Sequence, residues 1–275
     1  MLSLLKAKSL LNYSKNGLCS VDDSQFHFLH PTKNKINSKC LSVMSPSNYI
    51  KQEEPQTPEN CSFDPLILQY LQPFSKYMKL IELTQENILR EIEIRSKQEK
   101  HLSATSTRKV IIFDMDETLL HYSHEANRVF VRPFCDSMIL QLSAYFDLWI
   151  WTCAQKEYAD LLLDTYIDPE NKFFKHRFYR DSCIKVTESL YVKDIRIFKG
   201  ISAANVIIVE NQLMSFSSCL SNGYLCDTYT DAADDQELLN ITNFMLAIKD
   251  EEDFRVPLCD SFQFQKCFEF LDKKK

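Results

Sequence analysis

Acidic and polar side chains directly follow three short apolar runs in this sequence. The runs and the residues after them are Lys109–Phe113 with Asp114-Met115-Asp116-Glu117-Thr118, Asp147–Trp151 with Thr152, and Asn205–Val209 with Glu210-Asn211. Apolar runs without polar alternation are typical of strands buried in a parallel sheet, whose ligands bind at the carboxyl ends of the strands. We therefore expect these side chains to meet at one edge of a sheet. Clustered carboxylates there need a compensating cation, and their oxygens suit Mg²⁺ in a site that handles phosphate.

Helical patterns of about a dozen residues separate or follow these runs. They cover Phe134–Tyr145, Gln155–Tyr166 and Asp234–Ile248. Buried strands that alternate with helices predict an α/β fold of Rossmann-like type, with a parallel central sheet and helices on both faces.

Several motifs together resemble one family of phosphatases. The string Phe113-Asp-Met-Asp-Glu-Thr-Leu-Leu-His121 is similar to the D-x-D-x-T motif of the haloacid dehalogenase superfamily, in particular its small phosphatases of the RNA polymerase II C-terminal domain, also called NLI-interacting-factor-like phosphatases. Further segments resemble this family in register over about 108–258: Val131-Arg132-Pro133 (V-x-R-P), Trp151-Thr152-Cys153-Ala154 (F-T-A-S), 177–183 (R-L-F-R-E-S-C), Tyr191-Val192-Lys193-Asp194 (Y-V-K-D), 207–211 (I-I-V-D-N), Asn222-Gly223 (N-G) and 235–238 (D-x-E-L).

The resemblance implies four catalytic residues. Asp114 would attack the phosphorus and become an aspartyl phosphate, which is a recognised covalent route for a carboxylate. Asp116 would protonate the leaving alkoxide and later deprotonate the hydrolytic water. Thr152 would donate a hydrogen bond to the phosphoryl group, and Lys193 would supply a compact positive charge.

The resemblance also implies a cofactor and a substrate contact. Mg²⁺ would be held by the Asp114 side chain, the Asp116 backbone carbonyl and Asn211. Arg180 matches a family arginine near the substrate phosphoryl group, although the nearby Arg177 and Lys175 are alternatives in sequence. The implied substrate is a phosphoserine or phosphothreonine protein, such as the RNA polymerase II C-terminal domain or another phosphoprotein.

Two departures from the family pattern leave an alternative open. Glu210 stands where the family usually has aspartate, and the glycine that commonly precedes Y-V-K-D is missing from 187–190. An added methylene displaces a carboxylate, and Mg²⁺ tolerates poor octahedral geometry badly. The alternative to a phosphatase is a catalytically weak or inactive phosphopeptide-binding scaffold. A small-molecule phosphatase is a third option, which the absence of a large cap insertion disfavours.

Composition excludes other classes of protein. Only three glycines occur, which is too few for a P-loop or a dinucleotide-binding fingerprint. Residues 1–105 carry 13 basic and 11 acidic side chains, which leaves 19 and 27 for 106–275; such an acidic region argues against direct binding of nucleic acid. The ten cysteines have no C-x-x-C pair, and no apolar run is long enough for a membrane span. We expect buried reduced cysteines, no membrane association and a location in the nucleus or cytoplasm.

Three regions are expected along the chain. Residues 1–75, rich in Ser, Asn, Lys and Gln, are interpreted as a mostly disordered tail, 76–104 as an amphipathic helix, and 105–275 as the phosphatase domain. Leu80, Leu83, Ile88 and Ile92 recur at helical spacing. Packing of the segment 76–101 on its own domain is the favoured interpretation, and pairing with a partner's helix is the alternative.

Overall fold

The computed structural model describes residues 75–97 and 106–273 of the chain. The predicted tail, 1–75, lies outside the described residues apart from Ser75, and so does the stretch 98–104 of the predicted helical region. Among the described residues, no helix combines the length and the apolar composition needed to cross a membrane.

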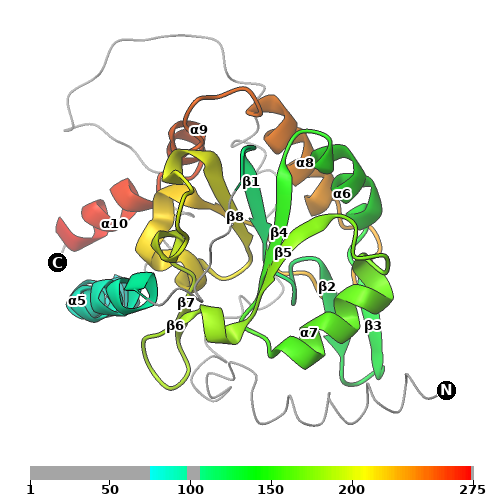
Figure 1. Ribbon diagram of the computed structural model, residues 1–275, viewed down its shortest axis with the longest axis horizontal. Coiled ribbons are helices and arrows are strands. Elements are labelled where there is room, and N and C mark those ends of the chain that lie inside the picture. Colours follow the sequence, from blue (N-terminus) through cyan, green and yellow to red (C-terminus); the bar gives the residue numbers. More distant parts are fainter. Residues whose placement is uncertain (1–74, 98–105, 274–275) are drawn as a thin grey trace.

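A five-stranded parallel sheet forms the centre of the fold, in the order β5-β4-β1-β8-β9 (Figure 1). Its strands are β1 (Val110–Phe113), β4 (Asp147–Trp151), β5 (Phe174–Phe178), β8 (Val206–Glu210) and β9 (Gly223–Leu225). The central strand β1 is in register with both neighbours, so that Phe113 pairs with Ile150 on one side and Val209 on the other. The α/β fold with a parallel central sheet is thereby confirmed.

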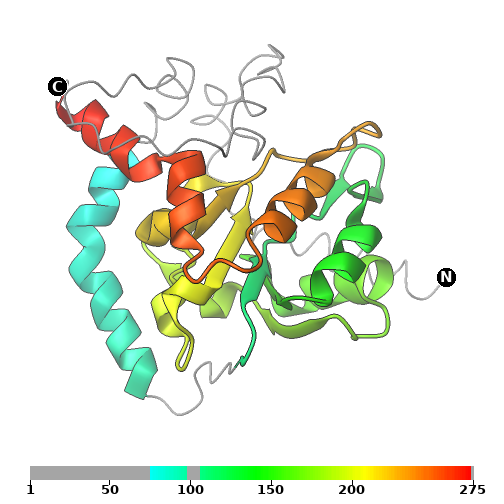
Figure 2. The ribbon, with the colours of Figure 1, turned by 90° about the horizontal axis from the view of Figure 1, so that it is seen from above.

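Helices cover both faces of the sheet (Figures 1 and 2). One side carries α6 and α8, which contact each other, and the other carries η8, against which α5, α9 and α10 pack. The helices are α5 (Ser75–Lys97), α6 (Cys135–Ser143), α7 (Lys156–Leu162) continued by the π-helical turn η4 (Leu163–Ile167), α8 (Glu237–Ala247), α9 (Arg255–Phe262) and α10 (Phe264–Lys273); the 3₁₀ segments are η5 (Arg180–Ser182), η6 (Ile195–Ile197), η7 (Ala203–Asn205) and η8 (Leu213–Asn222).

Two small hairpins stand outside the central sheet. One is formed by β2 (Leu120–Ser123) and β3 (Arg128–Val131), and the other by β6 (Ile184–Lys185) and β7 (Tyr191–Val192). The second hairpin closes without the glycine that the family places there, because the Thr187 hydroxyl accepts the backbone N–H groups of Ser189 and Leu190 at 3.3 and 3.0 Å. None of the residues 187–190 has a positive φ, so this turn does not need glycine.

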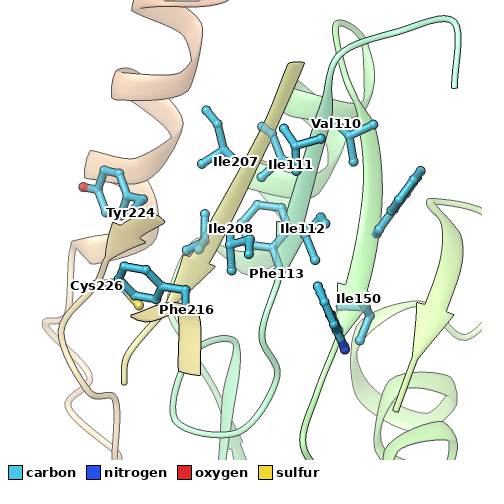
Figure 3. Packing of buried hydrophobic residues seen from close by; sticks show 14 of the residues in the cluster. Val110, Ile111, Ile112, Phe113, Ile150, Ile207, Ile208, Phe216, Tyr224 and Cys226 are labelled. Carbon is cyan, nitrogen blue, oxygen red and sulfur yellow. The ribbon is translucent and has the colours of Figure 1, made fainter. Parts of the chain in front are cut away.

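The core lies between the sheet and its helices, where the β1 and β8 side chains are fully buried (Figure 3). At one point the packing depends on a glycine. A Cβ atom built on Gly223, the first residue of β9, would lie only 2.0 Å from the ring of Phe216 in η8. Figure 3 shows the Phe216 ring close to Ile208 and Cys226 in this layer.

The helix α5 docks on the rest of the domain rather than projecting away from it. Ile88 is buried, and Arg95 donates hydrogen bonds to the carbonyls of Ser182 and Cys183 at 2.9 and 3.0 Å. Pairs of Glu and a basic residue four positions later add support along the helix, at Glu91–Arg95 and Glu93–Lys97. Figure 2 shows α5 along the side of the domain beside α10.

Candidate active site

Asp114 lies where the central strand ends. It is buried with 7% of its surface exposed, and its backbone N–H donates to the Val209 carbonyl at 2.9 Å, which continues the ladder between β1 and β8. Lys193 Nζ donates to Asp114 Oδ1 at 2.6 Å, and the Thr118 hydroxyl donates to Oδ2 at 3.2 Å. Both carboxylate oxygens are therefore oriented by neighbours.

Lys193 is shared by two carboxylates. Its Nζ lies 2.6 Å from Asp114 Oδ1 and 2.5 Å from Glu210 Oε2, and the side chain is fully buried. Burial disfavours the ammonium form, but the negative charges of Asp114 and Glu210 outweigh it and raise the pKa of Lys193 far above its usual value. Lys193 is therefore a permanent cation in this site.

Glu210 is directed at Lys193, and its longer side chain still makes that contact. Its other oxygen, Oε1, accepts the Gln212 backbone N–H at 3.1 Å, so both oxygens are engaged. Burial, together with the charge of Asp114, raises the pKa of Glu210 to about 8. The residue that departs from the family motif thus positions the lysine.

Asp116 sits at the mouth of the site, two residues after Asp114. The Tyr158 hydroxyl, from α7, donates to Asp116 Oδ1 at 2.9 Å. Burial raises the pKa of Asp116 well above its usual range, and the negative charges of Glu117 and Asp114 add to the effect. A raised pKa favours the protonated form of the carboxyl group, which is the form that a general acid requires.

The loop after β1 has a constrained backbone. Glu117 adopts a positive φ of 57°, which is uncommon for a residue other than glycine. Its backbone N–H and carbonyl bond to Leu120 and Tyr229 at 2.7 Å each, and Arg132 donates to the Thr118 carbonyl at 3.1 Å. This network fixes the angle at which Asp114 and Asp116 face the site.

Arg132 also joins two of the sequence motifs. Its guanidinium is fully buried and donates to both Asp235 oxygens, at 2.8 and 2.9 Å. It therefore holds the loop after β1 against the segment before α8, where Asp235 also accepts the Glu237 backbone N–H at 3.0 Å.

Thr152 and Arg180 belong to adjacent turns after β4 and β5. Thr152 is buried, and its hydroxyl accepts the Ala154 backbone N–H at 3.0 Å. Arg180 Nε donates to the Cys153 carbonyl at 2.6 Å, which places the guanidinium beside the Thr152 turn.

The two basic residues that could be mistaken for Arg180 in sequence have other partners. Arg177 pairs with Asp164 at 2.6 Å, and Lys175 pairs with Asp147 at the start of β4. Of the three, Arg180 is the one whose hydrogen bond reaches the Thr152–Cys153 turn.

A family model described as NLI interacting factor-like phosphatase matches residues 109–255, which is more than half of the chain. The chain belongs to the NLI interacting factor-like phosphatase family. All of the residues that the resemblance assigned to catalysis, metal and substrate lie inside this region, whereas α5 lies outside it.

Several named relatives are similar to this family member. CTD small phosphatase-like protein 2 of Dictyostelium discoideum is 32% identical over 58% of the chain and 30% of its own length. Nuclear envelope morphology protein 1 of Saccharomyces cerevisiae is 26% identical over 57% of the chain and 42% of its own length. Among solved structures, that of Fcp1, an essential RNA polymerase II CTD phosphatase, aligns with a TM-score of 0.38 and 14% identity, covering 70% of this chain and 65% of the other. The chain thus spans less than half the length of these two relatives.

The donor set fits a divalent cation. Asp114 Oδ2 and Asn211 Oδ1 both lie within reach of the Thr118 hydroxyl, at 3.2 and 3.5 Å, so these two oxygens converge on one place. Asp114, Asp116, Glu117 and Glu210 all have raised pKa values, and Lys193 pairs with two of them, Asp114 and Glu210. A 2+ ion would offset the excess negative charge.

No three His, Cys, Asp or Glu side chains form a metal cluster among the described residues. The expected ligands, one carboxylate, one amide and one backbone carbonyl, stay a prediction; Mg²⁺ keeps several of its waters and needs few protein ligands.

Some residues of the site were not predicted from the sequence. Tyr158 fell within a predicted helix, and Arg132 and Asp235 fell within two of the motifs, but none of the three was given a role. Each acts through a contact between segments far apart in the chain: Tyr158 with Asp116, and Arg132 with Asp235. An arginine beside a proline, with a later acidic residue before a predicted helix, is the sequence signal that could have indicated the second pair.

Proposed function

We propose that this chain is a Mg²⁺-dependent protein serine/threonine phosphatase that acts through an aspartyl phosphate on Asp114. The observation that carries the proposal is the pair of carboxyl groups at the end of β1. Asp114 is oriented by Lys193 and Thr118, and Asp116 has a raised pKa two residues away. One group is thus prepared as a nucleophile and the other as an acid, as the reaction needs.

Each residue then has a role in phosphoryl transfer. Asp114 Oδ attacks the phosphorus as the bond to the serine or threonine oxygen breaks, and Asp116 gives its proton to that oxygen. Asp116, now ionised, takes a proton from the water that hydrolyses the aspartyl phosphate. Lys193, Thr152 and Arg180 bind the phosphoryl oxygens. Asp114, Asn211 and the Asp116 carbonyl would hold Mg²⁺, which when bound neutralises charge that develops on those oxygens.

The substrate is proposed to be a phosphoserine or phosphothreonine segment of a protein. The hairpin β2–β3 is small, and the described chain between Thr152 and Lys193 holds only α7, η4, β5, η5 and the hairpin β6–β7. The absence of a cap domain among the described residues supports a polypeptide substrate over a small molecule. We place the protein in the nucleus or cytoplasm; relatives named nuclear envelope morphology protein 1 are compatible with the nucleus.

The test is hydrolysis of phosphoserine and phosphothreonine peptides, and of an aryl phosphate, with and without Mg²⁺. Chelation should abolish turnover, and readdition of Mg²⁺ should restore it. Asp114→Asn should abolish turnover as well, and wild-type protein quenched in acid should carry an acid-stable phosphate that Asp114→Asn lacks. Mg²⁺-dependent turnover that survives in Asp114→Asn would show that the nucleophile is wrong.

A phosphopeptide-binding scaffold is distinguished in the same assay. It would bind the peptide without turnover, and Glu210→Asp would restore turnover. The contact of Glu210 with Lys193 supports the enzyme instead, since the longer side chain keeps the lysine in place. We expect Glu210→Asp to change turnover by less than about tenfold, a difference of about 1.4 kcal/mol.

A further inference from the structure

Two cysteines meet beside the candidate active site. Cys153 follows β4 by two residues, and Cys183 follows η5, which comes after β5. Because β4 and β5 are neighbours in the parallel sheet, their following turns lie side by side. The two sulfur atoms are 3.7 Å apart. The pair is formed by the fold, since 30 positions separate the residues in the chain.

The cysteine pair contacts Thr152 and Arg180, which are proposed to bind the phosphoryl group. Cys183 Sγ lies 3.8 Å from the Thr152 carbonyl, and the Cys153 carbonyl accepts a hydrogen bond from Arg180 at 2.6 Å. Burial and the neighbouring Cys153 raise the pKa of the Cys183 thiol, and the positive charge of Lys193 acts against that rise. Cys183 therefore stays a thiol, and the partly exposed Cys153 is the sulfur that first meets an oxidant.

Small molecules have a route to these sulfur atoms. Cys153 is partly exposed, whereas Cys183 is buried. A cavity of about 770 Å³ is lined by Cys183, Arg180 and Tyr191 on one side and by Ile88 and Arg95 of α5 on the other. A small peroxide needs far less space than this.

We propose that Cys153 and Cys183 are a modification site for hydrogen peroxide, which converts them into a reversible disulfide that switches off the active site. The formation of the disulfide stands on the geometry of the pair. Its effect on turnover rests on the proposed phosphatase function.

The chemistry takes two steps. The Cys153 thiolate attacks one peroxide oxygen, the O–O bond breaks, and the departing hydroxide takes up the thiol proton to leave as water, which gives a sulfenic acid. The Cys183 sulfur then attacks the Cys153 sulfur, an S–S bond forms, and the S–O bond breaks. The second hydroxide takes the Cys183 proton and leaves as water. Two thiols are oxidised by two electrons, and one peroxide is reduced to two waters.

The disulfide requires movement at the site. A disulfide has an S–S distance of about 2.05 Å, so the sulfur atoms must approach by about 1.7 Å from their present 3.7 Å. That movement draws the backbone that carries Thr152 and the Arg180 acceptor toward η5. Because a misplacement of about 1 Å in a positioning group can cost on the order of 100-fold in rate, we expect turnover to fall by about 10- to 100-fold. A thiol reductant reverses the bond by exchange.

The chain offers matched variants for the test. The F-T-A-S motif that residues 151–154 resemble has alanine at the position of Cys153, so Cys153→Ala removes the pair with a residue that the motif itself uses. Cys259→Ala is the control, because Cys259 is exposed in α9 and belongs to the surface rather than to the pair. Cys183→Ser provides a second variant from the buried side.

The reduced full-length protein is treated with hydrogen peroxide, digested without reduction and mapped by mass spectrometry. Wild type and Cys259→Ala should yield a peptide that links Cys153 to Cys183, and their aryl phosphatase activity should fall and return with dithiothreitol. Cys153→Ala should keep its activity at the same peroxide dose. Absence of the linked peptide in wild type overturns the disulfide, and equal loss of activity in Cys153→Ala overturns the switch. The peptide map needs no activity, so it stays informative if the protein proves not to be a phosphatase.

Discussion

The contact between Gly223 and Phe216 yields a sharp prediction about stability. Gly223→Ala places a Cβ atom 2.0 Å from a ring atom of Phe216, whereas two carbon atoms pack best at about 3.5–4.0 Å. To remove this steric clash, the Phe216 ring must move by at least about 1.5 Å, although it is completely buried. Overpacking of this kind costs about 1–3 kcal/mol and occasionally more, and we expect Gly223→Ala to lie at the upper end of that range.

Two further variants separate crowding from backbone strain. Phe216→Leu removes the ring that the new methyl group meets, so the double variant Gly223→Ala/Phe216→Leu should be more stable than the sum of the single effects predicts, by at least about 1 kcal/mol. Gly200→Ala is the matched control, because Gly200 has a φ of 79° and its substitution is strained by the backbone. Phe216→Leu should not rescue Gly200→Ala.

Urea unfolding at fixed Mg²⁺ concentration, followed by circular dichroism, measures these free energies. The reasoning fails if Gly223→Ala costs less than about 0.5 kcal/mol, or if the effects of Gly223→Ala and Phe216→Leu are additive within about 0.5 kcal/mol. Activity gives a second measurement, since the neighbouring Ser215 carbonyl accepts the Lys193 backbone N–H at 2.6 Å. Gly223→Ala, which displaces Phe216, should therefore lower turnover more than Gly200→Ala does, when the two variants are compared at the same free energy of unfolding.

Three other predictions concern buried polar groups. Burial raises the pKa of Glu237 to about 7 from about 4.5, so the stability that its protonated form contributes is present below about pH 4.5 and is lost as the pH rises to 7. This loss is on the order of 3 kcal/mol. Glu237→Gln should remove it, which unfolding at several pH values would show. Arg132→Met leaves Asp235 without its buried partner and should cost about 3–5 kcal/mol in the same assay, whereas no loss would show that the pair is dispensable. Tyr158→Phe removes a hydrogen bond that favours ionised Asp116, so the alkaline limb of the pH–rate profile should move upward by up to about one pH unit, and a downward shift would contradict that role.

The central strands could be predicted because their composition is simple. Val110–Phe113 and Val206–Glu210 are nearly continuous runs of apolar, mostly β-branched residues, and such runs are typical of strands covered on both faces. The edge strands β5 and β9 were not predicted. β5 has the sequence FKHRF with three polar residues in its middle, and β9 has only three residues, the first of which is glycine. Partly exposed or very short strands carry little pattern.

The residues of the site were predicted by motif, but their partners were not. The positions of Asp114 and Lys193 follow from short local strings, whereas the sharing of Lys193 between Asp114 and Glu210 depends on how β1, β8 and the segment after β7 come together. The cysteines illustrate the same limit. Cys153 and Cys183 are unrelated by spacing, and only the neighbouring positions of β4 and β5 bring them together.

The hydrogen bonds from Arg95 have a thermodynamic consequence for the site. This residue lies outside the region matched by the family model, yet it binds the carbonyls of Ser182 and Cys183, two and three residues after Arg180. Docking of α5 and the conformation of the Arg180 turn are therefore coupled energetically, because a change in one alters the free energy of the other. If Arg180 binds the substrate phosphate as proposed, this coupling is reciprocal: a ligand that draws α5 away weakens substrate binding by the same factor by which bound substrate weakens the binding of that ligand. On the proposed function, residues 75–97 would then tune substrate affinity without touching a reacting atom.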